Sequence, residues 1–261
     1  MKVLKYLAIS AVVGSSLMLT GCRDDFSDLN TDPSQIAEAE VSYLFARSIV
    51  EFEPYGYLMY YYNAPMMQQW AQTGTATGGY TPNFVTTAPT GDQGDKYINV
   101  LKYVRAIEHA IESMNDDSAL KNTGYLHCSK VLCAYLGILA TDMYGDIPFT
   151  EACRAQYGGT ITPKYDRQSD LYDLWLDEIN AAIKAFNAPE GFVIVSKQDC
   201  AFNGDWTKWS KFANSLKLRI AARLINVDRE RAKKIAAEVG AAPYIDSMDD
   251  ALLFNKSISN S

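Results

Sequence analysis

Apolar residues recur along most of this chain at the three- to four-residue spacing of amphipathic helices. The first such stretch spans Pro33–Glu51, where Asp32 can act as the N-cap and Pro33 as the first helical residue. One face of this predicted helix carries the apolar side chains together with a single serine: Val41, Leu44, Phe45, Ser48 and Ile49. The pattern predicts a helix with one buried face.

The middle of the chain predicts two further helices. The earlier one is defined by six apolar positions at helical spacing: Tyr97, Val100, Leu101, Val104, Ile107 and Ile111. The later one spans Leu126–Met143 and is apolar on nearly all sides, which is typical of a helix buried within a protein. Gly145 can take a left-handed conformation after it, and Pro148 prevents it from continuing.

Three more helices are predicted towards the C-terminus. Leu171–Phe186 has helical spacing and is followed by Asn187 and Pro189. Asp205 can cap the next helix, whose buried stripe contains Trp209, Phe212, Ala213, Leu216 and Ile220 and whose solvated face contains Lys208, Lys211, Lys217, Arg219 and Arg223. The last helix is Asp228–Val239, with Gly240 past its end.

The fold class predicted from these patterns is all-α. Only Phe192–Val195 has the character of a strand, and this stretch is short. Consecutive helices joined by modest loops favour antiparallel pairs, so a helical bundle or an α-solenoid is expected. The spacing between helices is too irregular for a regular repeat array.

A tyrosine-rich stretch and a long loop lie between the first two groups of helices. Residues 55–72 are predicted to be helical, with a kink or break at Pro65. Residues 73–90 are rich in Gly, Thr and Pro and are predicted to be a loop. Structureless loops of this length are uncommon in compact domains and are often functional.

The N-terminus has the pattern of an export signal. Met1–Gly21 combines Lys2 and Lys5 with an apolar middle, which is too short for the ~20 residues that span a bilayer. Leu19-Thr20-Gly21-Cys22 resembles a bacterial lipobox, in which the cysteine receives acyl chains that hold the protein on a membrane. The predicted organisation is a signal peptide over residues 1–21, a lipidated tether over 22–31 and a helical domain over 32–261.

Charge and cysteine content narrow the possible partners. The net charge of the chain is −7, and it becomes more negative when Lys2 and Lys5 are removed with the signal. This argues against nucleic acid as a partner. Besides Cys22, the chain has Cys128, Cys133, Cys153 and Cys200, which are interpreted as small buried thiols. Cys128 and Cys133 should not meet, because a separation of five residues places them on different faces of one helix.

Four segments together resemble the SusD/RagB family of nutrient-binding outer-membrane lipoproteins. They are the lipobox followed by Asp28-Leu29-Asn30-Thr31-Asp32-Pro33, the run Thr141–Phe149 with Glu151-Ala152, Gly204–Trp209, and Lys211–Arg223. Arg23-Asp24-Asp25 is similar to a tag that sends lipoproteins to the cell surface, although a solvated linker is the alternative. Together these segments are spread over nearly the whole mature chain.

The resemblance implies a mostly helical fold built from irregular tetratricopeptide-like helix pairs. It also implies a lipid-anchored, surface-facing outer-membrane protein that binds oligosaccharide or peptide and passes it to a SusC-like TonB-dependent transporter. Such proteins usually run to roughly twice this length, so the chain resembles the N-terminal part of the family domain. No enzymatic activity and no cofactor are implied.

Catalytic and metal-binding patterns have no clear counterpart in the sequence. Asp28-x-Asn30-x-Asp32 begins like a calcium loop, but Pro33 and Ala39 occupy positions that should be Gly and Glu. His109 and His127 belong to no metal-binding spacing. A carboxylate pair of Asp142 and Asp146 could act on a glycoside, but nothing distinguishes it among 31 acidic residues. We therefore expect neither a catalytic site nor a metal site.

The preferred ligand site lies in the loop that follows residue 72. Tyr80 and Phe84 offer aromatic faces for sugar rings, and Asn83 can both donate to and accept from hydroxyl groups. Trp70 and Tyr61 can flank this site, although helix packing also explains both. A similar arrangement of an aromatic residue and an asparagine occurs in sugar-binding relatives, and ordinary surface variability of a loop is the alternative.

Two other functions compete with nutrient capture. One is a helical adaptor lipoprotein that faces the periplasm and recruits protein partners. The other is a glycan-degrading enzyme, which ranks third because no catalytic pattern is visible in the sequence.

Overall fold

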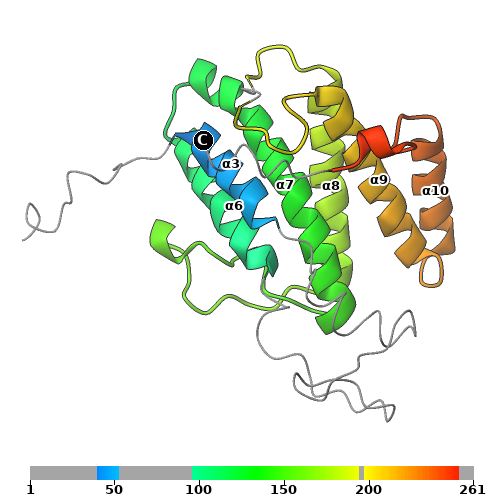
Figure 1. The fold of residues 1–261 in the computed structure, drawn as a ribbon. Coiled ribbons are helices and arrows are strands. Elements are labelled where there is room, and N and C mark those ends of the chain that lie inside the picture. Colours follow the sequence, from blue (N-terminus) through cyan, green and yellow to red (C-terminus); the bar gives the residue numbers. More distant parts are fainter. Residues whose placement is uncertain (1–39, 53–95, 194–196, 253–261) are drawn as a thin grey trace, which may run out of the picture. The chain divides into compact units, whose positions relative to one another are not determined.

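The computed structural model describes residues 40–52, 96–193 and 197–252, and these are mostly helical (Figure 1). The α-helices in this part of the chain are α3 (Val41–Glu51), α6 (Lys96–Glu112), α7 (Asp116–Tyr144), α8 (Gln168–Asn187), α9 (Trp206–Leu224) and α10 (Arg229–Gly240). Two short 3-10 turns, η2 (Ala155–Tyr157) and η3 (Met248–Asp250), complete the elements. Over these ranges there is no strand, and Ile147 and Asp166 form a single isolated bridge. The predicted all-α fold is confirmed.

Several predicted segments lie outside the described residues. They are the signal and tether, residues 33–39 of the first predicted helix, the predicted helix over 55–72 and the loop over 73–90. Phe192 and Val193 of the predicted strand are described and form no strand; instead, the Val193 backbone N–H donates to the Lys121 carbonyl at 3.0 Å.

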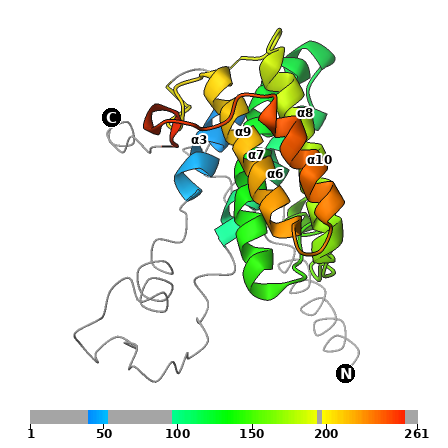
Figure 2. The same ribbon diagram turned by 90° about the vertical axis from the view of Figure 1, so that its right-hand side faces the viewer.

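Helix α7 is the centre of the packing, because it contacts α3, α6 and α8 along its length and α9 more lightly (Figures 1 and 2). Its buried residues lie on all sides of the helix, as the apolar sequence predicts. The helix begins at Asp116 rather than at Leu126, so the predicted start is wrong. Asn115 caps this earlier start by accepting from the Ser118 N–H, and the acidic first turn suits the helix dipole.

The remaining helices follow one another as packed neighbours: α6 with α7, α7 with α8, α8 with α9 and α9 with α10. Each pair is joined by a direct connection, which gives the sequential helix pairs of a tetratricopeptide-like arrangement (Figure 1). Among the helices of the described ranges, none is long and apolar enough to cross a membrane.

Aromatic side chains fill the core between the helices. Trp209 on α9 is fully buried, as predicted, and its ring contacts Phe45 and Phe202. Trp206 is partly buried and stacks on Phe186 of α8 at 5.5 Å. The ring of Trp206 occupies space left by Gly124, where an added Cβ would lie 2.7 Å from the indole. Both tryptophans therefore hold helices together.

Two predictions for the last helices need correction. Lys217 was expected on the solvated face of α9, but it is buried and its Nζ lies 3.0 Å from a carboxylate oxygen of Glu238. The reason is that α10 packs against α9 and covers this position. Gly240 is the last residue of α10 rather than a residue past its end, and its backbone φ is not positive.

The four cysteines that the structure describes are free thiols. Cys128 and Cys133 are buried, as predicted, whereas Cys153 and Cys200 are half-buried. Burial raises the pKa of the Cys128 and Cys133 thiols well above the ordinary value. Because the thiolate is the reactive form, both side chains serve as small apolar groups of the core.

Candidate functional site

The residues predicted to bind ligand and lipid lie outside the described ranges. Cys22 precedes residue 40, and the five candidate ligand residues, Tyr61, Trp70, Tyr80, Asn83 and Phe84, all fall within residues 53–95. Both assignments therefore stay predictions, and the structure neither assembles nor separates these side chains.

The structure does define where the described chain meets this predicted binding segment. Phe52, which follows α3, packs edge-on against Tyr135 of α7 with ring centroids 5.4 Å apart. Tyr97, at the start of α6, is buried and its hydroxyl donates to the Pro148 carbonyl at 2.8 Å. The residues on both sides of 53–95 are thus packed against α7 and the chain that follows it.

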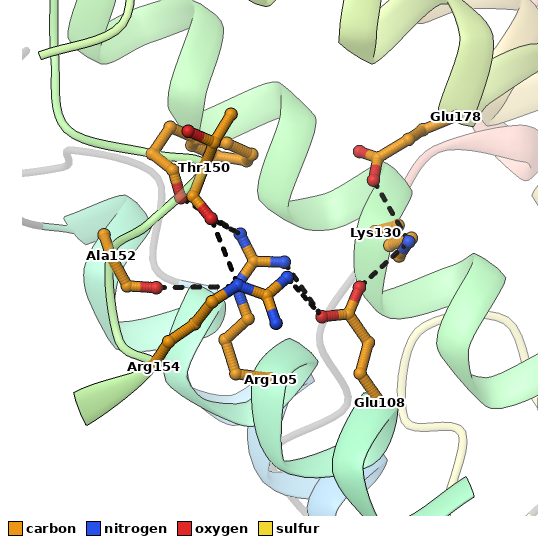
Figure 3. A network of polar contacts seen from close by, with 8 residues as sticks. Arg105, Glu108, Lys130, Thr150, Ala152, Arg154 and Glu178 are labelled. Carbon is orange, nitrogen blue, oxygen red and sulfur yellow. Dashed lines mark hydrogen bonds and ion pairs between the residues drawn. The ribbon is translucent and has the colours of Figure 1, made fainter. Parts of the chain in front are cut away.

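Five charged side chains form a polar network between the helices (Figure 3). Glu108 of α6 lies at its centre and makes ion pairs with Arg105, Lys130 and Arg154 at 2.9, 3.0 and 3.1 Å. Lys130 of α7 also reaches Glu178 of α8 at 3.1 Å. The network therefore joins three helices to Arg154 in the α7–α8 connection, residues 145–167.

Arg105 fastens the α7–α8 connection to α6. Its guanidinium donates to the backbone carbonyls of Phe149 at 3.0 Å, and of Thr150 and Ala152 at 3.4 Å (Figure 3). Arg154 adds a donor to the Thr150 carbonyl at 3.1 Å. Because a planar guanidinium offers five fixed donors, one buried arginine can satisfy several carbonyls of an irregular segment.

Burial and ion pairing act in opposite directions on this network. Burial by itself would raise the pKa of Glu108, but the attraction of Lys130 and Arg105 outweighs it and lowers that pKa. Burial dominates at Glu178 and raises its pKa, because Lys130 is its only ion-pair partner that the structure describes. Burial by itself would lower the pKa of Lys130, but the attraction of Glu178 and Glu108 outweighs it and raises that pKa. The charged network thus serves to hold the helices together.

Asp166 fixes the other end of the same connection. One carboxylate oxygen accepts from the backbone N–H groups of Phe149 at 3.0 Å and Thr150 at 2.7 Å, and the other accepts from the Thr150 hydroxyl at 2.7 Å. Burial alone would raise the pKa of Asp166, but these hydrogen bonds to Thr150 and Phe149 lower it. Asp166 is therefore a structural carboxylate.

Asp199 organises the turn that leads into α9. Its buried carboxylate accepts from the backbone N–H groups of Ala201, Phe202 and Gly204 and from the indole N–H of Trp209 at 2.9 Å. Asp205 then caps α9 through Thr207 and Lys208, as predicted. The Gly204–Trp209 motif consequently has a structural explanation.

The carboxylates considered for glycoside chemistry are both engaged in structural contacts. Asp142 accepts two hydrogen bonds from Nε of Arg223 on α9, each at 2.7 Å. Asp146 accepts from the backbone N–H of Gln168 at the start of α8, at 2.9 Å. Both carboxylates therefore have structural partners in the fold.

The histidines also have structural surroundings. His109 stacks on Tyr157 with centroids 4.5 Å apart. His127 lies near the rings of Phe186 and Phe192, and burial, aided by the charge of Lys130, lowers its pKa to about 4. Among the residues with described placement, no group of three or more His, Cys, Asp or Glu side chains could hold a metal ion.

The described residues define a class of helical protein built from irregular tetratricopeptide-like helix pairs. Residues 33–260 match the SusD-like family described as starch-binding and associating with the outer membrane. The chain belongs to this SusD-like family. No curated protein matches the chain.

Solved structures extend this comparison. A chitin-binding protein is 26% identical, with a TM-score of 0.59 over 82% of this chain and 42% of its own. A SusD-like protein of Bacteroidetes is also 26% identical, with a TM-score of 0.61 over 83% of this chain and 39% of its own. A SusD homologue from Bacteroides fragilis shares the fold at 18% identity, with a TM-score of 0.56 over 81% of this chain and 43% of its own. The chain thus spans less than half the length of these relatives.

The network residues Arg105, Glu108, Lys130 and Glu178 were not found by sequence reasoning. They lie on three different helices, and nothing in the local pattern of each helix indicates that they meet. The one available signal was the presence of charged residues within otherwise apolar stretches, as for Lys130 inside α7.

Proposed function

We propose that this chain is a surface-exposed lipoprotein that binds an oligosaccharide, or another oligomeric nutrient, and delivers it to a SusC-like TonB-dependent transporter. Membership of the SusD-like family is the observation that carries the proposal. The structure of a chitin-binding protein that is 26% identical to this chain supports a glycan as the ligand class. The lipid anchor is Cys22, and the ligand residues are Tyr80, Asn83 and Phe84 with Trp70 and Tyr61 beside them.

The described body suits a binding role because its connections are held firmly. Arg105 and Asp166 fasten the α7–α8 connection through backbone hydrogen bonds. Phe52 and Tyr97 pack firmly on both sides of the segment that carries the proposed ligand residues. Sites supported by such preorganised surroundings lose less conformational entropy on binding.

Ligand binding is tested with the full chain on a panel of oligosaccharides that includes chitin and starch fragments. For a ligand that the parent binds, the double variant Tyr80→Ala with Asn83→Ala should weaken the binding free energy by ~1–3 kcal/mol, by analogy with aromatic stacking on nucleic-acid bases. Tyr43→Ala and Tyr244→Ala are matched controls, because both remove exposed tyrosines elsewhere. Equal affinity of the double variant and the parent would contradict this site.

The anchor and its orientation need a separate test. Metabolic labelling with a fatty acid should mark the parent and not Cys22→Ala, because acylation requires the thiol. Protease treatment of intact cells should remove the protein if it faces outward. Complete protection would favour the adaptor that faces the periplasm, and release of shortened sugars by the purified protein would favour the enzyme.

A further inference from the structure

Arg219 of α9 is a half-buried cation that has no anionic partner among the residues that the structure describes. Its guanidinium lies over the ring of Tyr135 on α7, with Cζ 4.9 Å from the ring centroid. The Nε–H group is buried and meets no acceptor, whereas the terminal Nη groups are not buried. An arginine that loses part of its water normally gains a partner in exchange. The Nη donors of Arg219 are therefore available to a group from outside the described helices.

Arg223, one turn further along α9, has the partner that Arg219 lacks. Its Nε donates to both carboxylate oxygens of Asp142 at 2.7 Å, and its Nη1 donates to the Arg219 carbonyl at 3.4 Å. The negative charge of Asp142 is thus balanced by Arg223. An anion that approaches Arg219 consequently meets a neutralised ion pair beside it rather than a free carboxylate.

Tyr135 gives this site an aromatic wall and a hydroxyl group. Phe52 packs edge-on against its ring at 5.4 Å, and Phe212 of α9 lies 6.3 Å away, so the ring is held from two sides. Its hydroxyl has no hydrogen-bond partner within the described ranges, and the oxygen is not buried. Phe52 directly precedes residues 53–95, which carry the predicted ligand residues. A cation, a hydroxyl group and an aromatic ring therefore meet where that segment begins.

The chemistry of these groups suits a carboxylate. A guanidinium offers a planar pair of donors that matches the two oxygens of a carboxylate, and such charge-assisted hydrogen bonds are stronger than neutral ones. Stacking on an aromatic face orients the guanidinium and leaves its donating edge open. One guanidinium balances one carboxylate, and the net charge of −7 disfavours a ligand with many negative charges. A ligand with a single carboxylate fits these conditions.

We propose that Arg219 and Tyr135 form a subsite for the carboxylate of one acidic sugar in the oligosaccharide ligand. This inference rests on the proposed function and adds the charge of the ligand to it. The Nη groups of Arg219 bind the carboxylate, and the Tyr135 hydroxyl donates to the same group. Binding supplies the missing counter-charge of Arg219, so an acidic sugar gains an attraction that a neutral sugar lacks.

Matched pairs of oligosaccharides test this subsite with the full chain. Calorimetry compares xylotriose with xylotriose that carries one glucuronic acid, and lactose with sialyllactose. The methyl ester of each acidic sugar removes the charge and leaves the sugar otherwise unchanged. At least one acidic sugar should bind about tenfold more tightly than its neutral counterpart and its ester.

Arg219→Gln should abolish the preference for the acidic sugar. Arg229→Gln is the matched control, because Arg229 is an exposed arginine at the start of α10, and the preference should survive in it. Tyr135→Phe keeps the ring and removes the hydroxyl, so it should lower the affinity for the acidic sugar a few-fold and leave that for its ester unchanged. Circular dichroism checks that each variant is folded, and Arg219→Lys, which keeps the charge without the planar fork, should retain only part of the preference.

The outcomes separate this subsite from the proposed function. Failure of both acidic sugars to bind, or equal affinity for an acidic sugar and its ester, overturns the inference. Glycan binding stands if a neutral fragment of chitin or starch is still bound, and it falls as well if no sugar is bound. A preference that survives in Arg219→Gln overturns the assignment to this site. Arg219-dependent binding of a glutamate tetrapeptide, without binding of the acidic sugars, overturns the inference and assigns the subsite to a peptide ligand.

Discussion

Gly137 offers the sharpest test of the packing between α7 and α8. A Cβ atom at this position would lie 2.4 Å from Cζ2 and 3.0 Å from Cε2 of the Trp175 indole. Trp175 has no exposed surface, and its ring packs edge-on against Phe149 at 5.3 Å and Tyr172 at 5.9 Å. The indole therefore has little room to withdraw, and Gly137→Ala should push the two helices apart.

Two opposing effects set the size of the change. Alanine is better than glycine inside a helix by ~1 kcal/mol. Overpacking a core costs ~1–3 kcal/mol, and so close an overlap with a rigid buried ring belongs at the upper end. We expect Gly137→Ala to lower the free energy of unfolding by a net ~1–2 kcal/mol, or the Tm by about 2–8 °C at this chain length.

Urea unfolding followed by circular dichroism measures this change, and Gly240→Ala is the matched control. Gly240 ends α10, and an added Cβ there meets nothing within 4 Å. Its replacement should be neutral or stabilising by up to ~1 kcal/mol. Trp175→Phe removes the overlapping atoms, so it should reduce the effect of Gly137→Ala in the double variant. Equal stability of Gly137→Ala and Gly240→Ala would refute the packing argument.

Three further changes test individual contacts. His127 has a pKa of about 4 in the folded chain against an ordinary value of 6.5, so the unfolded chain binds this proton more tightly. The free energy of unfolding should therefore fall by at most ~3 kcal/mol as the pH drops from 6.5 to 4. His127→Phe should remove this part of the pH dependence in urea titrations, and an unchanged pH dependence would contradict the assignment. Asp199→Asn should destabilise by ~2–4 kcal/mol because one amide oxygen cannot serve four donors, whereas Asp205→Asn, also a good N-cap, should change little in the same melts. Arg105→Met should lower the free energy of unfolding by ~3 kcal/mol, because it removes one of the cations that pair with Glu108. It should also speed proteolysis of the α7–α8 connection, and cleavage at the parental rate would contradict this role of Arg105.

Much of the helical framework could be predicted from local pattern. Asp205 and the stripe beginning at Trp209 predicted α9, because a capping side chain and helical spacing are local properties. The start of α7 was missed because residues 116–125 are mostly polar and small, and their helix depends on the Asn115 cap and on neighbours distant in sequence. The position of Lys217 was also wrong, since only the packing of α10 on α9 buries it.

The ligand residues remain predictions, so the proposed function rests on family membership and on the described helices. Sequence alone determined the helical class, the cap of α9 and the apolar stripes, because helix formation and amphipathic spacing depend on neighbouring residues. Tertiary structure alone decided which charged residues meet, as in the network around Glu108, and which apolar side chains stay in water, as at Ile161 and Val227. Both depend on contacts between segments far apart in the chain, whose distances no local pattern encodes.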